Sequence, residues 1–255
     1  MRATLRFAVL VLAAVGLSAA EPAYVGKWKM NVSKSDFGQL TVTYEAIAGG
    51  DIKTTMDGQS YTARVDAKEV PTPWGTTAAW KSIDSKTWEV TQRANGKVIS
   101  TDTMKLSDDD KTLIVDSQMT KISGDPAVGY IVFQRVSGGP GLGGTWKTSK
   151  MSTSSPSVLE ISAKGSDGLV LKFVDQNGVC DAKFDGKDHP ATGPMWPSGW
   201  SCMIAKRGDA GFDVEWKKDG KRMYMSSFTA EGKTLTETGG AAGTQERIKV
   251  VYDKQ

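Results

Sequence analysis

The sequence predicts an all-β protein built from two tandem antiparallel β-barrel units that follow a signal peptide. Three observations support this fold class: the pattern of the first twenty residues, short alternating segments that end at turn residues, and an internal repeat. Glycine is frequent, at 28 residues, and long helical patterns are absent. Both features favour short strands joined by tight turns.

Residues 1–20 have the order of residues typical of a secretory signal peptide. Arg2 and Arg6 give a basic start, residues 7–17 are almost wholly apolar, and Ser18-Ala19-Ala20 supplies the small residues that a signal peptidase reads. The apolar stretch is shorter than the roughly 20 residues that a membrane helix needs. We therefore expect a periplasmic or secreted protein with no membrane span in the mature chain.

The chain repeats itself in the same order. Six short segments of the first half recur in the second half at offsets of about 118 to 124 residues. For example, Gly26-Lys27-Trp28-Lys29 recurs as Gly144-Thr145-Trp146-Lys147. This collinear recurrence predicts two copies of one structural unit, at residues 24–136 and 144–255. The glycine-rich residues 137–143 are then expected to form a flexible linker.

Each unit shows the alternation typical of half-buried strands. In the first unit, residues 88, 90 and 92 (Trp, Val and Gln) alternate with residues 89, 91 and 93 (Glu, Thr and Arg). Asn95-Gly96 follows as a two-residue hairpin turn. In the second unit, residues 212–217 alternate in the same way before Asp219-Gly220. Alternation of this kind places one strand face in a core. About 110 residues with frequent turn signals suit one small antiparallel barrel or sandwich per unit.

The Gly-x-Trp opening followed by a β-meander resembles the calycin group, which comprises the lipocalins and the intracellular fatty-acid-binding proteins. Residues 24–30 are similar to the start of the latter, and Tyr252-Asp253-Lys254 is similar to their end. The resemblance implies an up-and-down barrel in each unit, with a cavity for a small apolar ligand. It also implies that Trp28 and Trp146 close the barrels beneath the basic residues Arg135 and Lys254. Stacking on a ligand is the alternative role of these two tryptophans.

The chain departs from the fatty-acid-binding proteins at the position that binds the fatty-acid head group. Their Arg-x-Tyr motif on the last strand has no arginine here, because its position holds Ile131 in the first unit and Val250 in the second. Little chain between Asn31 and Leu40 remains for their two-helix lid. We therefore do not expect a fatty-acid carboxylate at this position.

Six further tryptophans are candidate ligand-binding residues, as cavity wall or mouth: Trp74, Trp80, Trp88, Trp196, Trp200 and Trp216. Trp88 and Trp216 fall near the middle of predicted strands. The loops that contain Trp74 and Trp200 are rich in proline and glycine and occupy corresponding places in the two units. Aromatic rings in such loops form either a mouth over a cavity or a plug that packs on the barrel.

Cys180 and Cys202 are the two cysteines, and in an oxidising compartment we expect them to form a disulfide. His189 is the single histidine, which excludes a multi-histidine metal site, and its turn position indicates an incidental loop residue. We find no catalytic motif and expect no metal or cofactor. The net charge of +3 falls to about +1 without the signal peptide, which is no footprint of nucleic-acid binding.

The expected function is that of a secreted binding protein with a small hydrophobic or amphipathic ligand in a barrel cavity. One alternative is a structural or interaction protein whose Trp/Pro loops bind a protein or a polysaccharide. Another is an enzyme on the same scaffold, which needs a cluster of titratable groups that sequence spacing does not reveal. The sequence does not identify a protein partner.

Overall fold

The computed structural model describes residues 21–47, 49–120, 126–154, 157–193, 196–244 and 247–255. The expected signal peptide, at residues 1–20, lies outside the described residues. The described chain is all-β, with two short 3₁₀ helices, η1 (Val32–Lys34) and η2 (Val174–Gln176), beside its strands. No helix in these ranges has the length and apolar character to cross a membrane.

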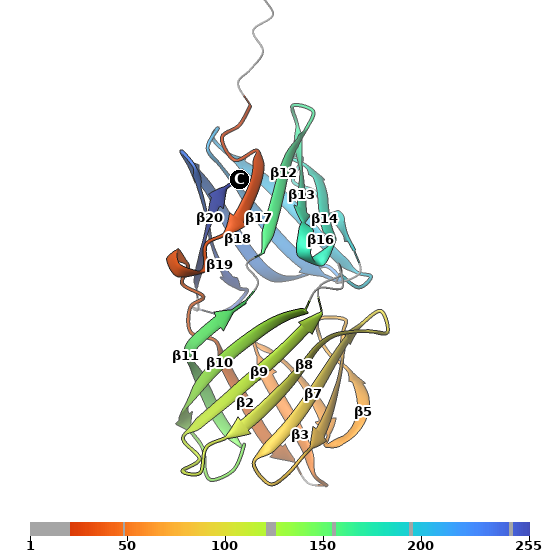
Figure 1. Ribbon diagram of the computed structural model, residues 1–255. Helices are drawn as coiled ribbons and strands as arrows, with labels where there is room; N and C mark the ends of the chain where they lie inside the picture. The colour runs from red at the N-terminus through yellow and green to blue at the C-terminus, as the bar shows by residue number, and fades with distance from the viewer. Residues whose placement is uncertain (1–20, 48, 121–125, 155–156, 194–195, 245–246) are drawn as a thin grey trace, which may run out of the picture.

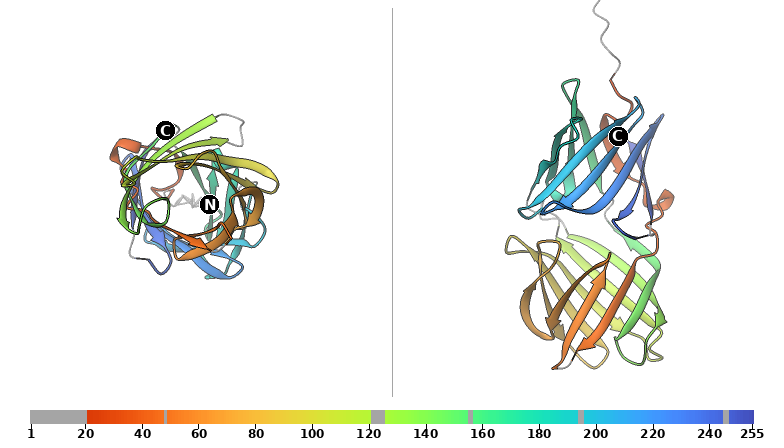
Figure 2. Two further views of the ribbon diagram at one scale, coloured as in Figure 1. Left: turned by 90° about the horizontal axis from the view of Figure 1, so that it is seen from below. Right: turned by 180° about the vertical axis from the view of Figure 1, so that it is seen from behind.

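The strands form two ten-stranded antiparallel sheets, each rolled into a barrel, and the two barrels stack end to end (Figures 1 and 2). The first barrel contains β2 (Thr41–Ile47), β3 (Asp51–Met56), β4 (Gln59–Arg64), β5 (Asp66–Pro71), β6 (Thr77–Ser82), β7 (Thr87–Ala94), β8 (Lys97–Leu106), β9 (Thr112–Thr120), β10 (Pro126–Ser137) and β11 (Gly144–Thr153). The second barrel contains β1 (Gly26–Met30), β12 (Val158–Lys164), β13 (Gly168–Phe173), β14 (Gly178–Lys183), β15 (His189–Thr192), β16 (Trp200–Arg207), β17 (Gly211–Lys218), β18 (Lys221–Glu231), β19 (Thr234–Ala241) and β20 (Ile248–Lys254). The two-barrel, all-β fold class predicted from the sequence is confirmed.

The two barrels exchange their first strands relative to the sequence repeat. Strand β1, from the first repeat, lies in the second barrel between β12 and β20. Strand β11, from the second repeat, lies in the first barrel between β10 and β2. The folded unit and the repeated sequence unit are therefore offset by one strand, and the chain crosses the junction twice.

Residues 138–143 connect β10 to β11 as the loop of an antiparallel hairpin, where glycine content predicted a flexible linker. The Arg135 guanidinium fixes this loop: Nη1 donates a hydrogen bond of 2.6 Å to the Gly143 carbonyl, and Nη2 donates to the Gly141 carbonyl. Leu142 is buried in the core of the first barrel. A connection this short places β11 directly beside β10, which explains the strand exchange.

The two barrels close differently. The second sheet is hydrogen-bonded all the way around. In the first sheet the consecutive strands β4 and β5 are the two edges, and no described ladder joins them. The corresponding strands of the second barrel, β14 and β15, pair at Val179–Thr192 and Cys180–Ala191.

A tryptophan closes the core of each barrel at the end remote from the junction. Trp28 and Trp146 are both fully buried. The Trp28 indole donates a 2.8 Å hydrogen bond to the Tyr24 carbonyl, and the Trp146 indole donates a 2.9 Å hydrogen bond to the Leu142 carbonyl. The same local geometry in both barrels shows that the Gly-x-Trp segments are structural equivalents. The open ends of the two barrels consequently face each other.

Candidate ligand-binding cavities

Two cavities lie at the facing ends of the barrels, one inside each. The cavity of the second barrel has a volume of about 390 Å³, and the cavity of the first about 380 Å³. Both volumes fall in the range of small-molecule sites. Asp57 of the first barrel reaches the wall of the second cavity, and Tyr224 of the second barrel lines both cavities. Each barrel thus completes the cavity of the other.

Aromatic side chains form much of the wall of the second cavity. Trp196 lies at the centre of this group, with its ring centroid 4.8 Å from that of Trp216 and 5.3 Å from that of Phe173. Trp200 stacks on Tyr224 with an interplanar angle of 9°. Trp216 points inward because it continues the alternation of the buried residues on β17. Trp196 lies in the loop before β16, and Trp200 is the first residue of that strand.

A carboxyl group faces the same cavity. Glu237 lies on β19 directly opposite the fully buried Phe228, which stacks on Phe212 in the core of the second barrel. Its Oε1 accepts a 2.7 Å hydrogen bond from the Ser226 hydroxyl, and its Oε2 accepts a 2.8 Å hydrogen bond from the Tyr252 hydroxyl. Burial raises the pKa of Glu237, although both hydroxyl groups favour the charged form.

Sequence analysis missed Glu237, although the strand pattern holds a signal for it. Leu235, Glu237 and Gly239 follow one another at intervals of two on β19, and both neighbours are buried. Residues at this spacing share one face of a strand. A glutamate on the core-facing side of a strand violates the apolar pattern and marks a functional candidate.

The first cavity combines aromatic rings with more polar groups. Trp80 donates a 3.2 Å hydrogen bond from Nε1 to the Tyr61 hydroxyl, and its ring packs edge-on against Tyr44. Asp102 lines this cavity. Its Oδ2 accepts a 3.2 Å hydrogen bond from Gln92, and its Oδ1 accepts one from the Ser117 hydroxyl. Burial raises the pKa of Asp102 as well.

The two tryptophan loops meet at the junction between the barrels. The Trp200 indole donates a 3.1 Å hydrogen bond to the Trp74 carbonyl, and the Tyr224 hydroxyl donates a 3.1 Å hydrogen bond to Asp57. A side chain at Gly75 would approach the Pro197 ring to 3.2 Å, so the loops pack closely. The loops therefore connect the barrels as well as border their cavities.

The structure places the predicted tryptophans in three groups. Trp74 and Trp80 line the first cavity, whereas Trp196, Trp200 and Trp216 line the second. Trp88 packs against the core of the first barrel and is not among the residues that line these cavities. The loop tryptophans are half-buried and lie against other rings, which differs from a flat exposed rim.

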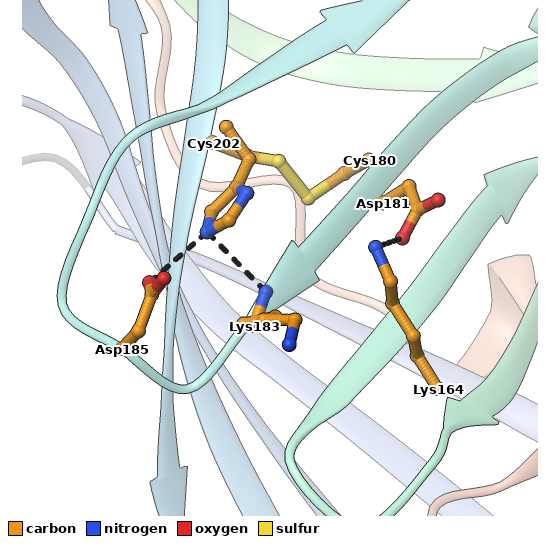
Figure 3. The surroundings of a disulfide bond; sticks show 7 residues. Lys164, Cys180, Asp181, Lys183, Asp185 and Cys202 are labelled. Atoms are coloured by element: carbon orange, nitrogen blue, oxygen red, sulfur yellow. Dashed lines mark hydrogen bonds and ion pairs between the residues drawn. A yellow bond between two sulfur atoms is a disulfide. The ribbon is translucent and has the colours of Figure 1, made fainter.

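The predicted disulfide between Cys180 and Cys202 is confirmed, and Figure 3 shows its surroundings. It joins β14 to β16 across the four-residue strand β15, and both cysteines are fully buried. His189 lies on β15, with Nε2 3.0 Å from Asp185. In the described part of the chain, no group of three or more His, Cys, Asp or Glu residues is arranged to hold a metal ion.

Comparisons with known proteins assign no family. No model of a known protein family matches the chain, and no curated protein matches it. Among solved structures, a candidate outer membrane protein of Bacteroides fragilis aligns over 91% of this chain and 97% of its own, at 11% sequence identity and a TM-score of 0.18. A likeness at this level carries no argument about function.

Proposed function

We propose that this protein is a binding protein that holds a small amphipathic molecule in the cavity of the second barrel. The aromatic-walled cavity of about 390 Å³ carries the proposal. Apolar walls with a few convergent polar groups are characteristic of small-molecule sites. Glu237 and Ser226 supply such groups in this wall, and Tyr252 holds the Glu237 carboxyl group from behind it by a hydrogen bond. The cavity of the first barrel is a second, more polar candidate site in the same chain.

The disulfide supports an extracytoplasmic place of action. Disulfides persist in oxidising compartments and are rare in the cytosol. Together with the signal-peptide pattern of residues 1–20, the bond between Cys180 and Cys202 favours a periplasmic or secreted carrier. The calycin resemblance noted from the Gly-x-Trp segments supports a carrier role in the same way.

Binding of the neutral fluorescent probe N-phenyl-1-naphthylamine to the mature chain, residues 21–255, tests the proposal. We expect saturable binding of one or two probes per chain and quenching of tryptophan emission. Trp196→Ala should weaken binding about tenfold, because it removes a central ring of the cavity wall. Trp88→Phe is the matched control and should leave binding unchanged, because Trp88 packs outside the described cavity linings.

Native mass spectrometry of gently purified protein supplies a second test. A co-purified small mass that organic extraction releases would identify the ligand class. A clean apo mass together with no probe binding would overturn the proposal, and the closely packed loops would then be read as a structural junction alone.

A further inference from the structure

We propose that the second cavity selects an organic cation, namely a protonated amine or a quaternary ammonium group on a small apolar body. This inference rests on the proposed function and adds the charge of the ligand. In the arrangement we envisage, the cationic group lies between Glu237 and the aromatic rings of the wall, and the apolar body fills the rest of the cavity.

The position of Glu237 is the first support. Glu237 is among the residues that line the cavity, on the strand β19 directly opposite Phe228 of β18, so a ligand that fills the cavity reaches it. Each carboxylate oxygen accepts one hydrogen bond, from Ser226 and from Tyr252. A carboxylate oxygen has a second lone pair, so acceptor capacity remains for a ligand.

The charge balance of the cavity is the second support. The described residues that line it include two acids, Glu237 and Asp57, and one basic residue, Arg247, whose Nη1 donates a 2.9 Å hydrogen bond to the Thr244 carbonyl. Burial of a carboxylate without an opposite charge is costly, and a cationic ligand would offset that cost. An anionic ligand would instead meet the carboxylate as a like charge.

The aromatic wall is the third support and acts in the same direction. The faces of tryptophan and tyrosine rings attract cations, and tryptophan does so most strongly. Trp196, Trp200, Trp216 and Tyr224 all line the cavity that contains Glu237. Rings and carboxylate together form the kind of site that recognises amines and quaternary ammonium groups.

The cavity of the first barrel also combines aromatic rings with an acidic side chain, but the acid lies at a different position of the repeat. Asp102 lines it, and the described residues around it include no lysine or arginine. By the sequence repeat, Asp102 corresponds to Ser226, and Glu237 corresponds to Val115. An acid therefore occurs in both cavities without occupying equivalent positions, which is not expected from the repeat alone.

The test compares three probes with one chain length: octyltrimethylammonium, octanol and octanoate. Each competes with N-phenyl-1-naphthylamine for the wild-type protein at pH 7.5. We expect the ammonium to bind about tenfold more tightly than the alcohol, and octanoate to bind most weakly. Glu237→Gln should remove most of the difference between ammonium and alcohol while it leaves the octanol affinity unchanged. Unchanged octanol affinity also shows that the variant is folded.

Glu231→Gln, at the exposed end of β18 and outside both described cavity linings, is the matched control. If Glu237 makes the selective site, this variant keeps the ammonium preference of the second cavity. Equal binding of the three octyl probes, or tightest binding of octanoate, would overturn the inference while the proposed function stands. Absence of any N-phenyl-1-naphthylamine binding would count against the proposed function itself, and the inference would fall with it.

Discussion

The ammonium group of Lys254 lies 5.1 Å from the centre of the Trp28 ring, although these residues belong to different sequence repeats. They are register partners in the β1–β20 ladder. The reciprocal pair is tighter, because the guanidinium of Arg135 lies 4.1 Å from the ring centre of Trp146. The sequence suggested a basic residue over each tryptophan, and the strand exchange determines which basic residue covers which ring.

Engineered cysteine pairs should report the strand exchange directly. Lys27 lies opposite Glu160 in the β1–β12 ladder, and their charged groups are 3.0 Å apart. We expect the double variant Lys27→Cys/Glu160→Cys to form an additional disulfide under mild oxidation, because the described chain has no free cysteine to compete. Intact-mass analysis and thiol titration measure the bond.

The control pair is Lys27→Cys/Thr43→Cys. Thr43 lies opposite Thr145, the repeat counterpart of Lys27, so this pair would be adjacent only without the exchange. Cross-linking of the control pair in place of the first pair would contradict the exchanged topology.

The two cation–π partners should differ in their contribution to stability. Arg135 also donates hydrogen bonds to the carbonyls of Asp110, Gly141 and Gly143, whereas Lys254 is exposed. We expect Arg135→Met to lower the free energy of unfolding by about 2 kcal/mol or more. Lys254→Met should lower it by about 0.5–1 kcal/mol. Equal losses in urea denaturation would show that the hydrogen bonds of Arg135 to the hairpin loop contribute little.

Loss of the disulfide should destabilise the second barrel. Strand β15 has four residues, so the ladders on its two sides are short, and the bond between Cys180 and Cys202 spans them. We expect the double variant Cys180→Ala/Cys202→Ala to lose about 3 kcal/mol of stability. Reductant should lower the denaturation midpoint of the wild type toward that of the variant. If the variant and wild type share a midpoint, the short ladders suffice on their own.

Glu237 should reduce stability as the pH rises. Burial raises its pKa in the folded state, so between the unfolded pKa of about 4.3 and the folded pKa the folded chain holds more protons. Stability therefore falls as the pH rises through that window. Around the carboxyl group, the titratable or charged groups are those of Tyr252 on β20 and of Tyr224, Asp57 and Arg247 along the cavity wall.

The variant Glu237→Gln should consequently be more stable than the wild type at pH 8, by an amount on the order of 1 kcal/mol. The difference should shrink as the pH falls toward 4, and urea denaturation at a series of pH values measures it. Glu231→Gln, at the exposed end of β18, is the control and should show no such trend. A variant that is less stable than the wild type at every pH would indicate that the charged form is fully compensated within the barrel.

The sequence by itself determined the local structure of this protein. Asn95-Gly96 and Asp219-Gly220 adopt the positive φ angles that their hairpin turns require, and the flanking residues form β7, β8, β17 and β18. Backbone conformation and side-chain alternation are local properties, so they are visible in short segments. The pairing of Cys180 with Cys202 followed from the presence of only two cysteines.

The tertiary structure alone decided which strands share a barrel and which side chains share a cavity. The Gly-x-Trp segments are so similar that β1 or β11 could pair with the strands of either repeat. The short hairpin loop at residues 138–143 places β11 beside β10, which leaves β1 to close the second barrel. Glu237, Ser226 and Tyr252 come from the three neighbouring strands β19, β18 and β20, and the registers of the two ladders between these strands bring them to one point. Such long-range pairing depends on chain connections and packing, which short sequence patterns do not encode.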